Sequence, residues 1–93
     1  MKARVVSGIK IEKLSDDEIK KRGVARWPVW EKEISTFDWT YDGAEQCYFL
    51  EGKVRVRADE GVVEIGPGDF VTFPSGLSCV WEVREPVRKH YKI

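Results

Sequence analysis

The chain has 93 residues, the size of one domain with a single modest core. Sixteen basic residues balance sixteen acidic ones, so the formal net charge is zero. This balance excludes the strong positive field with which many proteins attract nucleic acid or an anionic membrane. No apolar run approaches the roughly 20 residues of a membrane-spanning helix, and we expect a cytoplasmic protein. Abundant charge with few Gln and Met residues is typical of proteins from thermophiles.

The first 23 residues predict a peripheral strand and a short helix. Residues 5–14 alternate loosely between apolar and polar types, as an edge strand does. Ser15 can cap a helix start, and Glu18, three positions later, completes a capping box. Gly23 offers a C-terminal cap, so the helix is expected to end near Arg22.

The middle of the chain predicts strands with one apolar face. Pro28 makes residues 24–30 an edge strand or an irregular segment. Residues 35–42 then alternate with a period of two, which places Trp39 and Tyr41 together on the apolar face of a half-buried strand.

Two further strands are expected at residues 45–50 and 53–58. The Glu51-Gly52 pair between them predicts a β-hairpin turn. Short apolar strands follow at residues 62–65 and 70–73, separated by a turn rich in Gly and Pro.

The last part of the chain predicts two strands separated by Pro86. In the first, Cys79 and Trp81 share one face by alternation. In the second, Lys89 and Tyr91 share one face and His90 lies on the other, and alternation alone leaves open which face is inside. Many short strands with one short helix predict an all-β sandwich or barrel.

The stretch GPGDFVTFPSGLSCVW carries a spacing that resembles the second motif of the cupin superfamily. Gly68 is followed after five residues by Pro74, after one more by Gly76, and after two more by Cys79. In cupins a metal-binding His usually occupies the position of Cys79.

The first cupin motif has a counterpart upstream. Six residues separate Glu45 from Gly52, and three separate Tyr41 from Glu45, with Trp39 two positions before Tyr41. These spacings resemble the cupin motif, with Trp39 and Tyr41 at its two His positions. Motif and alternation therefore agree that these two side chains share one face.

The segments WPVWEKEISTFDW, EQCYFLEGKVRV and PVRKHYKI resemble the small single-domain cupins related to ureidoglycine aminohydrolase. The resemblance implies a double-stranded β-helix, a jelly-roll barrel whose mouth holds the site, with one short N-terminal helix. The expected organisation is one cupin domain over residues 1–93, with its core at 27–93 and the N-terminal strand and helix at 1–23.

The departure from the cupin pattern concerns its metal. Metal-binding cupins use three His and one Glu, whereas Trp39, Tyr41 and Cys79 stand at the His positions here and only Glu45 is kept. The one histidine, His90, is expected at the surface or a strand edge. Transition metals of this class prefer imidazole and carboxylate ligands, so we expect no metal cofactor and do not carry over the aminohydrolase reaction.

Glu45 and Lys89 are the expected catalytic residues. Glu45 is in phase with Cys47 and faces the interior, where an ionised carboxylate needs a partner. It is either a general acid/base or a structural group held by a Lys and a Tyr hydroxyl. Lys89 either pairs with Glu45, holds a substrate anion, or is a solvated charge at a strand edge. Tyr91, on the same face as Lys89, is its expected neighbour.

Aromatic residues and cysteines are expected around this pair. Trp39, Tyr41 and Trp81 either line a small-molecule site or form plain core, whereas Trp27 and Trp30 are expected to be structural or interfacial. Cys47 and Cys79 are included among the candidate substrate contacts, with inert buried thiols as the alternative and a disulfide left open.

The sequence therefore predicts a small-molecule-binding cupin, an enzyme such as a hydrolase or isomerase acting on a small polar metabolite without a three-His metal site. One alternative is a non-catalytic binding module that keeps the pocket. The other is a structural domain that forms a homodimer through an edge strand or an exposed Trp face. No nucleic acid or membrane partner is expected.

Overall fold

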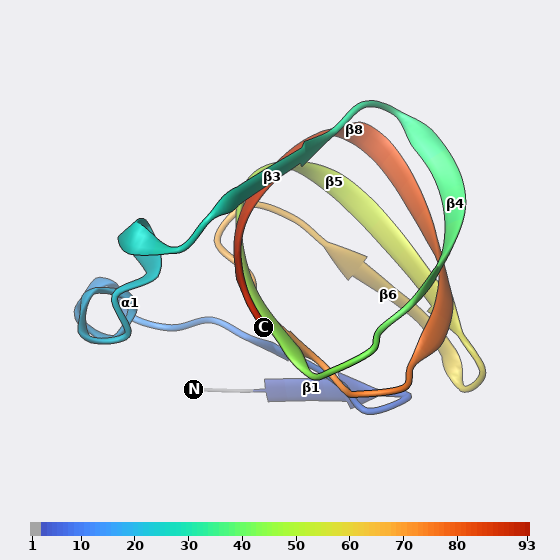
Figure 1. The fold of residues 1–93 in the computed structure, drawn as a ribbon, viewed down its shortest axis with the longest axis horizontal. Coiled ribbons are helices and arrows are strands. Elements are labelled where there is room, and N and C mark those ends of the chain that lie inside the picture. Colours follow the sequence, from blue (N-terminus) through green and yellow to red (C-terminus); the bar gives the residue numbers. More distant parts are fainter. Residues whose placement is uncertain (1–2) are drawn as a thin grey trace.

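The computed structural model describes residues 3–93, which form an antiparallel sheet rolled into a barrel (Figure 1). The elements are, in chain order, β1 (Ala3–Val6), β2 (Ile9–Glu12), α1 (Asp16–Lys21), the 3-10 turn η1 (Val24–Arg26), β3 (Val29–Lys32), β4 (Ser35–Thr40), β5 (Glu45–Ala58), β6 (Gly61–Ile65), β7 (Phe70–Phe73) and β8 (Ser78–Lys92). The strand order is β1-β2-β7-β5-β8-β3, with β4 paired to β8 and β6 to β5. The expected all-β barrel with one short α-helix is confirmed. Residues 1 and 2 of the expected domain lie outside the described residues.

The N-terminal segment is a hairpin rather than one edge strand. The predicted strand over residues 5–14 is wrong because Ser7 and Gly8 form a turn, with φ angles of 53° and 79°. β1 and β2 pair antiparallel across this turn, and β2 joins the barrel sheet at β7. The helix prediction is confirmed, since the Ser15 hydroxyl accepts the Glu18 backbone N–H at 3.2 Å. Between residues 3 and 93, no helix has the length and apolar character needed to cross a membrane.

Residues 24–30, predicted to be an edge strand or an irregular segment, contain a 3-10 turn and the start of a strand. The 3-10 turn η1 precedes Pro28, and β3 begins directly after it. β3 pairs with β8 and lies at the end of the sheet order, as an edge strand does.

β5 is one long strand, so the hairpin predicted at Glu51-Gly52 is wrong. The strand runs through Gly52, where its register with β8 shifts. Gly52 has a φ of 99°, and a Cβ at this position would collide with the backbone of Pro86 and Val87. The close approach of the two backbones requires glycine here. The irregularity changes the phase of the strand, which is why the alternation resembles that of two strands.

β8 is also one strand, so the break predicted at Pro86 is wrong. Pro86 lies opposite Gly52, at the irregular part of the β5–β8 pairing, where a missing backbone N–H is tolerated. The inward phase is unchanged across it, since Val83, Val87 and Lys89 are all buried. This continuity places Lys89 on the inner face, which the sequence left open.

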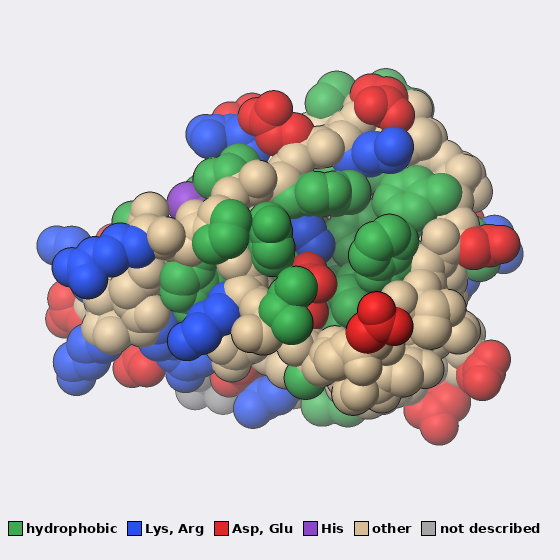
Figure 2. All heavy atoms as spheres, viewed as in Figure 1, with side chains coloured by type: hydrophobic (Ala, Val, Ile, Leu, Met, Phe, Trp, Pro, Cys, Tyr) green, Lys and Arg blue, Asp and Glu red, His purple; other side chains and the backbone are tan. Residues whose placement is uncertain are grey.

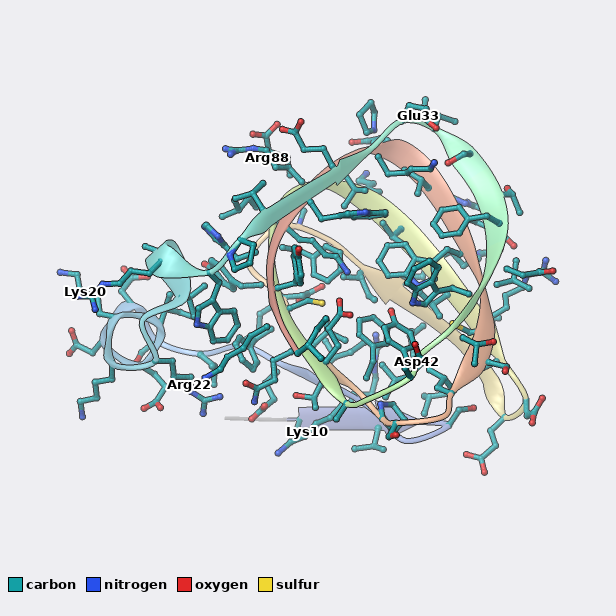
Figure 3. The ribbon with its side chains drawn as sticks, viewed as in Figure 1. Lys10, Lys20, Arg22, Glu33, Asp42 and Arg88 are labelled. Carbon is teal, nitrogen blue, oxygen red and sulfur yellow. The ribbon has the colours of Figure 1, made fainter. Side chains whose placement is uncertain are left out.

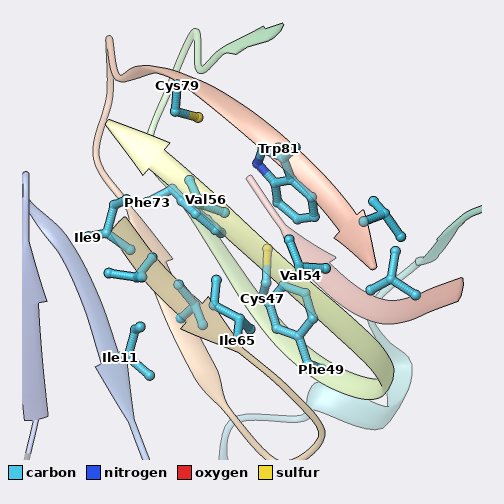
Figure 4. Close-up of a cluster of buried hydrophobic side chains, with 14 of the residues drawn as sticks. Ile9, Ile11, Cys47, Phe49, Val54, Val56, Ile65, Phe73, Cys79 and Trp81 are labelled. Carbon is cyan, nitrogen blue, oxygen red and sulfur yellow. The ribbon is translucent and has the colours of Figure 1, made fainter. Parts of the chain in front are cut away.

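The barrel is filled by apolar side chains from β2, β5, β6, β7 and β8 (Figure 4). Phe49, Val56 and Phe73 are fully buried, and Trp81 packs between Phe49 and Phe37 with ring centroids 6.2 and 6.0 Å away. Burying such a side chain contributes about 1.5–3 kcal/mol to folding. Trp81 belongs both to this core and to the cavity described next, so the core forms the floor of that cavity.

Candidate functional site

A cavity of about 210 Å³ enters the barrel and combines aromatic walls with one acid and one base. Figure 2 shows a hollow on this face, surrounded by hydrophobic side chains, with basic and acidic side chains visible inside it. The aromatic residues of its lining are Trp30, Phe37, Trp39, Tyr41, Trp81 and Tyr91, and its charged residues are Glu45 and Lys89. This composition, apolar walls with a few convergent polar groups, is that of a small-molecule site.

Strand pairing brings these residues together from distant parts of the chain. On β4 and β8, Phe37 lies opposite Trp81. On β3 and β8, Trp30 lies opposite Lys89, and on β5 and β8 Lys89 lies opposite Phe49. Lys89 therefore enters the barrel between β3 and β5. Its neighbour Arg88 points away from the barrel, toward Glu51 (Figure 3).

Glu45, Lys89 and Cys47 form a compact polar cluster at the base of the cavity. The Lys89 Nζ lies 3.2 Å from the Glu45 Oε2 and 3.2 Å from the Cys47 Sγ. The Cys47 thiol donates to the same Oε2, also at 3.2 Å. The carboxylate predicted to face the interior thus does so, with the predicted lysine as its partner. An ion pair with additional hydrogen bonds is what makes buried charges tolerable.

Aromatic rings enclose the Lys89 ammonium on its remaining sides. Its Nζ lies 4.7 Å from the ring centroid of Trp81 and 5.0 Å from that of Trp30, with Phe49 and Phe73 somewhat farther. Cations are attracted to ring faces at such distances. Lys89 is only 5 % exposed, so the rings and Glu45 replace much of the water that a lysine normally holds.

The Cys47 thiol stays protonated in this setting. Burial raises its pKa to about 12; the Lys89 ammonium acts in the opposite direction, and the Glu45 carboxylate raises the pKa further. Cys47 is fully buried and is not part of the cavity lining within the described chain. It acts here as a hydrogen-bond donor that supports Glu45, and a nucleophilic thiolate is not favoured.

Tyr41 and Trp81 each carry a buried polar group without a hydrogen-bond partner among residues 3–93. These groups are the Tyr41 hydroxyl and the Trp81 indole N–H. Burial, together with Cys47 and Glu45 nearby, raises the pKa of Tyr41 far above its usual range. The nearby Trp81 indole N–H lowers the pKa of Tyr41 slightly. It does not meet the geometry of a hydrogen bond to the Tyr41 hydroxyl. Both atoms are fully buried within the cavity wall, so neither is within reach of a molecule in the cavity.

Two predicted candidates, Cys47 and Cys79, do not line the cavity. Cys79 is buried next to β4, where its thiol is 3.6 Å from the Trp39 carbonyl oxygen, and it is not among the cavity-lining residues. Burial raises its pKa to about 11. Both cysteines are free thiols, so the open disulfide alternative is excluded. His90 lies on the face opposite Lys89, as predicted, with its Nδ1 2.9 Å from the Trp27 carbonyl oxygen.

Trp30 is the site residue that the sequence interpretation assigned elsewhere. It lines the cavity and holds Lys89, although it was expected to be structural or interfacial. Its role depends on the pairing of β3 with β8, two segments about 60 residues apart, which no local pattern indicates. Phe37 lies on the predicted apolar face, two positions before Trp39, and alternation could have named it.

The residues present do not fit the metal that the resemblance to cupins implies. Within residues 3–93 no group of three or more His, Cys, Asp or Glu side chains could hold a metal ion. The remaining ligand, Glu45, is paired with an ammonium ion, which would compete with any metal for its oxygens. Of the three replaced His positions, Trp39 and Tyr41 supply aromatic surface, whereas Cys79 is not among the residues that line the cavity.

Comparisons with solved structures identify several similar proteins. A DUF861-family protein from Thermotoga maritima is 55% identical, with a TM-score of 0.89 over 91% of this chain and 98% of that chain. The EutQ protein of Clostridium difficile is 27% identical, with a TM-score of 0.63 over 68% of this chain and 50% of its own. A putative ethanolamine utilization protein Q from Salmonella typhimurium, 23% identical, covers 89% of this chain and 66% of its own with a TM-score of 0.64, and shows the fold alone.

A comparison with curated proteins finds no match. The family model for the EutQ-like cupin domain matches residues 19–91, which is most of the chain. The cupin part of the expected resemblance is thereby confirmed, and it agrees with the observed barrel. The chain belongs to the EutQ-like cupin domain family.

Proposed function

We propose that the protein binds a small polar metabolite in the barrel cavity, at a site where the Glu45–Lys89 ion pair replaces a metal centre. The observation that carries this proposal is the cavity itself, in which aromatic walls surround the Glu45 carboxylate and the Lys89 ammonium. The cavity volume of about 210 Å³ likewise favours a ligand over a collapsed interior.

The relatives support this proposal at the level of the shared barrel fold that contains the cavity. The finer resemblance, to cupins related to ureidoglycine aminohydrolase, supports a small polar compound as ligand. The hydrolytic reaction of those relatives depends on their metal, so the proposal does not include it. The EutQ proteins share the domain, and no activity of theirs is transferred here.

A thermal-shift screen of small polar metabolites tests the proposal. We expect at least one compound to raise the melting temperature, since a ligand at a hundredfold excess over its Kd adds about 2.7 kcal/mol of stability. The rise should persist in the presence of a metal chelator. Trp39→Ala, at the cavity, should weaken the effect, whereas Ile34→Ala, an exposed apolar residue outside the cavity lining, should not. A broad panel without any stabilising compound would contradict the proposal.

An acid–base enzyme is the second candidate, favoured by the position of Glu45. Its carboxylate lines the cavity while a lysine and a thiol hold one of its oxygens, which orients it toward a bound molecule. A positioned carboxylate can exchange a proton with a ligand. NMR spectra of each stabilising compound, recorded over time with the wild type and with Glu45→Gln, separate the two candidates. Conversion only by the wild type indicates an enzyme, and an unchanged compound indicates a binding module.

A further inference from the structure

The polar groups that a molecule in the cavity can reach restrict the kind of ligand it accepts. Among residues 3–93, the fully buried side-chain N and O atoms without a partner lie on Tyr41, Arg55 and Trp81. Oε1 of Glu45 has no partner there either, since both hydrogen bonds of this carboxylate are on Oε2, but Oε1 is not one of the buried atoms. Glu45 lines the cavity with a side chain that is 13 % exposed, and an acidic side chain is visible inside the hollow (Figure 2). Oε1 is therefore the carboxylate oxygen that solvent in the cavity reaches.

The donors near this oxygen are occupied within the protein. The Lys89 ammonium contacts Oε2 of Glu45 and Sγ of Cys47, and aromatic rings surround the rest of it. The Cys47 thiol is fully buried and donates to Oε2. Tyr91 also lines the cavity, and its hydroxyl can accept as well as donate. Because Glu45 offers the cavity an acceptor, the complementary group of a ligand is a hydrogen-bond donor.

The charges beside this acceptor favour a neutral donor. Glu45 and Lys89 compensate each other at 3.2 Å. A bound anion would lie beside the Glu45 carboxylate, and a bound cation would add a second positive charge beside the Lys89 ammonium. Uncompensated charge is costly away from water, so both are disfavoured. A neutral O–H group can give Oε1 a short, charge-assisted hydrogen bond and leave the ion pair intact.

The walls of the cavity favour a compact ring with little further polarity. Apart from Glu45 and Lys89, the lining consists of aromatic side chains and Ile93. A ligand with many hydroxyl groups would lose water there with few protein partners in exchange. Trp39 is 49 % exposed, so its ring leaves apolar surface that a ligand can cover. Cavities of about 150 Å³ hold one benzene molecule, so the volume of about 210 Å³ accommodates a ring with a small substituent.

From these observations we infer that the cavity selects a neutral, compact ring that carries a single hydroxyl group, such as a phenol. Its O–H donates to Oε1 of Glu45, and its ring lies against the aromatic walls beside Trp39. This inference rests on the proposed function and specifies the ligand class of the same site. It differs from the binding of an anion by Lys89, which the sequence alone suggested.

Three ring compounds of similar size test the direction of the hydrogen bond: phenol can donate, benzonitrile can only accept and toluene can do neither. We expect protein-observed NMR titrations to give a phenol Kd at least tenfold below those of the other two. A cavity without a reachable acceptor would instead favour toluene, the most hydrophobic of the three. The indole N–H signal of Trp39 should shift on binding. Benzonitrile or toluene binding as tightly as phenol overturns the inference, as does the absence of phenol binding.

Two charged rings test the selection of a neutral ligand. Benzoate is an anion and benzylammonium is a cation, and both bring one ring of the same kind to the cavity. We expect each to bind at least tenfold more weakly than phenol in the same titrations. Equal or tighter binding of either one overturns the inference.

Glu45→Gln should reverse the hydrogen bond. The Cys47 thiol and the Lys89 ammonium both donate at the position of Oε2, so they hold the amide oxygen there and the NH₂ group takes the place of Oε1. We expect the phenol Kd to rise about tenfold and the benzonitrile Kd to fall about threefold to tenfold. Glu64→Gln makes the same change at an exposed position outside the cavity lining and should alter neither value. An unchanged phenol Kd in Glu45→Gln overturns the assignment, and the order of the three Kd values in the wild type decides the inference independently of this variant.

The two proposals fail in different ways. If phenol does not bind while the thermal-shift screen finds a ligand whose effect depends on Trp39, the inferred ligand class is wrong and the proposed binding function still stands. If neither the screen nor any of the ring compounds gives binding, both are wrong. Phenol binding that Trp39→Ala weakens and Ile34→Ala does not supports both.

Discussion

Two carboxylates of this protein pair with lysines, the buried Asp69 and the half-buried Glu45, and their surroundings differ. Asp69, in the turn between β6 and β7, uses both of its oxygens within the protein: Oδ2 accepts the Gly66 N–H at 2.8 Å and Oδ1 meets the Lys13 Nζ at 2.6 Å. Glu45 receives both of its contacts on Oε2 and faces a cavity. Asp69 therefore has a protein partner for each of its oxygens, whereas the protein partners of Glu45 both contact Oε2.

The lysine partners differ in the same way. The Lys13 side chain is 65 % exposed and keeps most of its water, so its ion pair with Asp69 belongs to the surface. Lys89 is enclosed by aromatic rings and depends on Glu45 for its compensation. A carboxylate–lysine pair whose lysine is hydrated, as at Asp69, stabilises a turn at the surface. A pair whose lysine is enclosed, as at Glu45, forms part of a cavity.

Removing each lysine should give the largest difference in stability between the two ion pairs. Lys89→Met keeps an unbranched apolar stem in the aromatic cage but leaves Glu45 as an uncompensated buried charge, which costs about 3–5 kcal/mol. Lys13→Met removes the partner of Asp69 from an exposed position, where an ion pair contributes about 0–1 kcal/mol. Urea denaturation followed by tryptophan fluorescence measures both free energies of unfolding.

A double variant identifies the cause of the Lys89 effect. Glu45→Gln/Lys89→Met contains neither charge, so it should recover most of the stability that Lys89→Met loses. If the double variant is as unstable as Lys89→Met, the loss comes from packing around the side chain and the ion-pair explanation is wrong. Similar losses in Lys89→Met and Lys13→Met would contradict the distinction between the two pairs.

Asp69→Ala and Trp39→Ala should separate stability from binding. Asp69→Ala leaves the Gly66 N–H without its acceptor and should cost about 1–3 kcal/mol of unfolding free energy, without weakening the binding of a compound found in the thermal-shift screen. Trp39→Ala should weaken that binding with a smaller loss of stability, because Trp39 lines the cavity and is 49 % exposed. Urea denaturation and titration of both variants with that compound give the four values. Weaker binding in Asp69→Ala would join the two regions functionally and contradict the separation.

Alternation predicted the inner face well where a strand is regular. Trp39, Tyr41, Glu45 and Trp81 all line the cavity, as a period of two and the cupin-like spacing indicated. These residues lie on stretches where each side chain alternates without interruption, so a local pattern contains the answer. Cys79 was also placed inward correctly, but burial against β4 keeps it out of the cavity.

The errors in the predicted fold have one physical origin. Gly52 and Pro86 each resemble a strand break when considered alone, whereas in the structure they face each other across the β5–β8 pairing and permit both strands to continue. The assignment of Trp30 failed for the same reason, because its place beside Lys89 is set by the pairing of β3 with β8. Such facts depend on contacts between distant segments, which local sequence patterns do not contain.

The smallest expected effect concerns Cys47, the thiol that belongs to the Glu45 pair and has no counterpart at Asp69. Its pKa is about 12 in the folded protein and near 8.5 in an unfolded chain. The native state therefore holds the proton to higher pH, so this contribution to stability is complete below pH 8.5 and is lost as the pH rises toward 12. The free energy of unfolding should fall by up to about 1.4 kcal/mol per pH unit in this window.

Cys47→Ser keeps a hydrogen-bond donor beside Glu45 and removes the titrating thiol. Its stability should consequently decline less steeply with pH than that of the wild type, measured by urea denaturation between pH 8.5 and 11. Cys79→Ser is the matched control. It should change the dependence of stability on pH over a narrower pH range, because the pKa of Cys79 is raised only to about 11. Identical slopes in the wild type and Cys47→Ser would mean that the thiol opens to solvent. The polar cluster at Glu45 would then be less enclosed than its 3.2 Å contacts indicate.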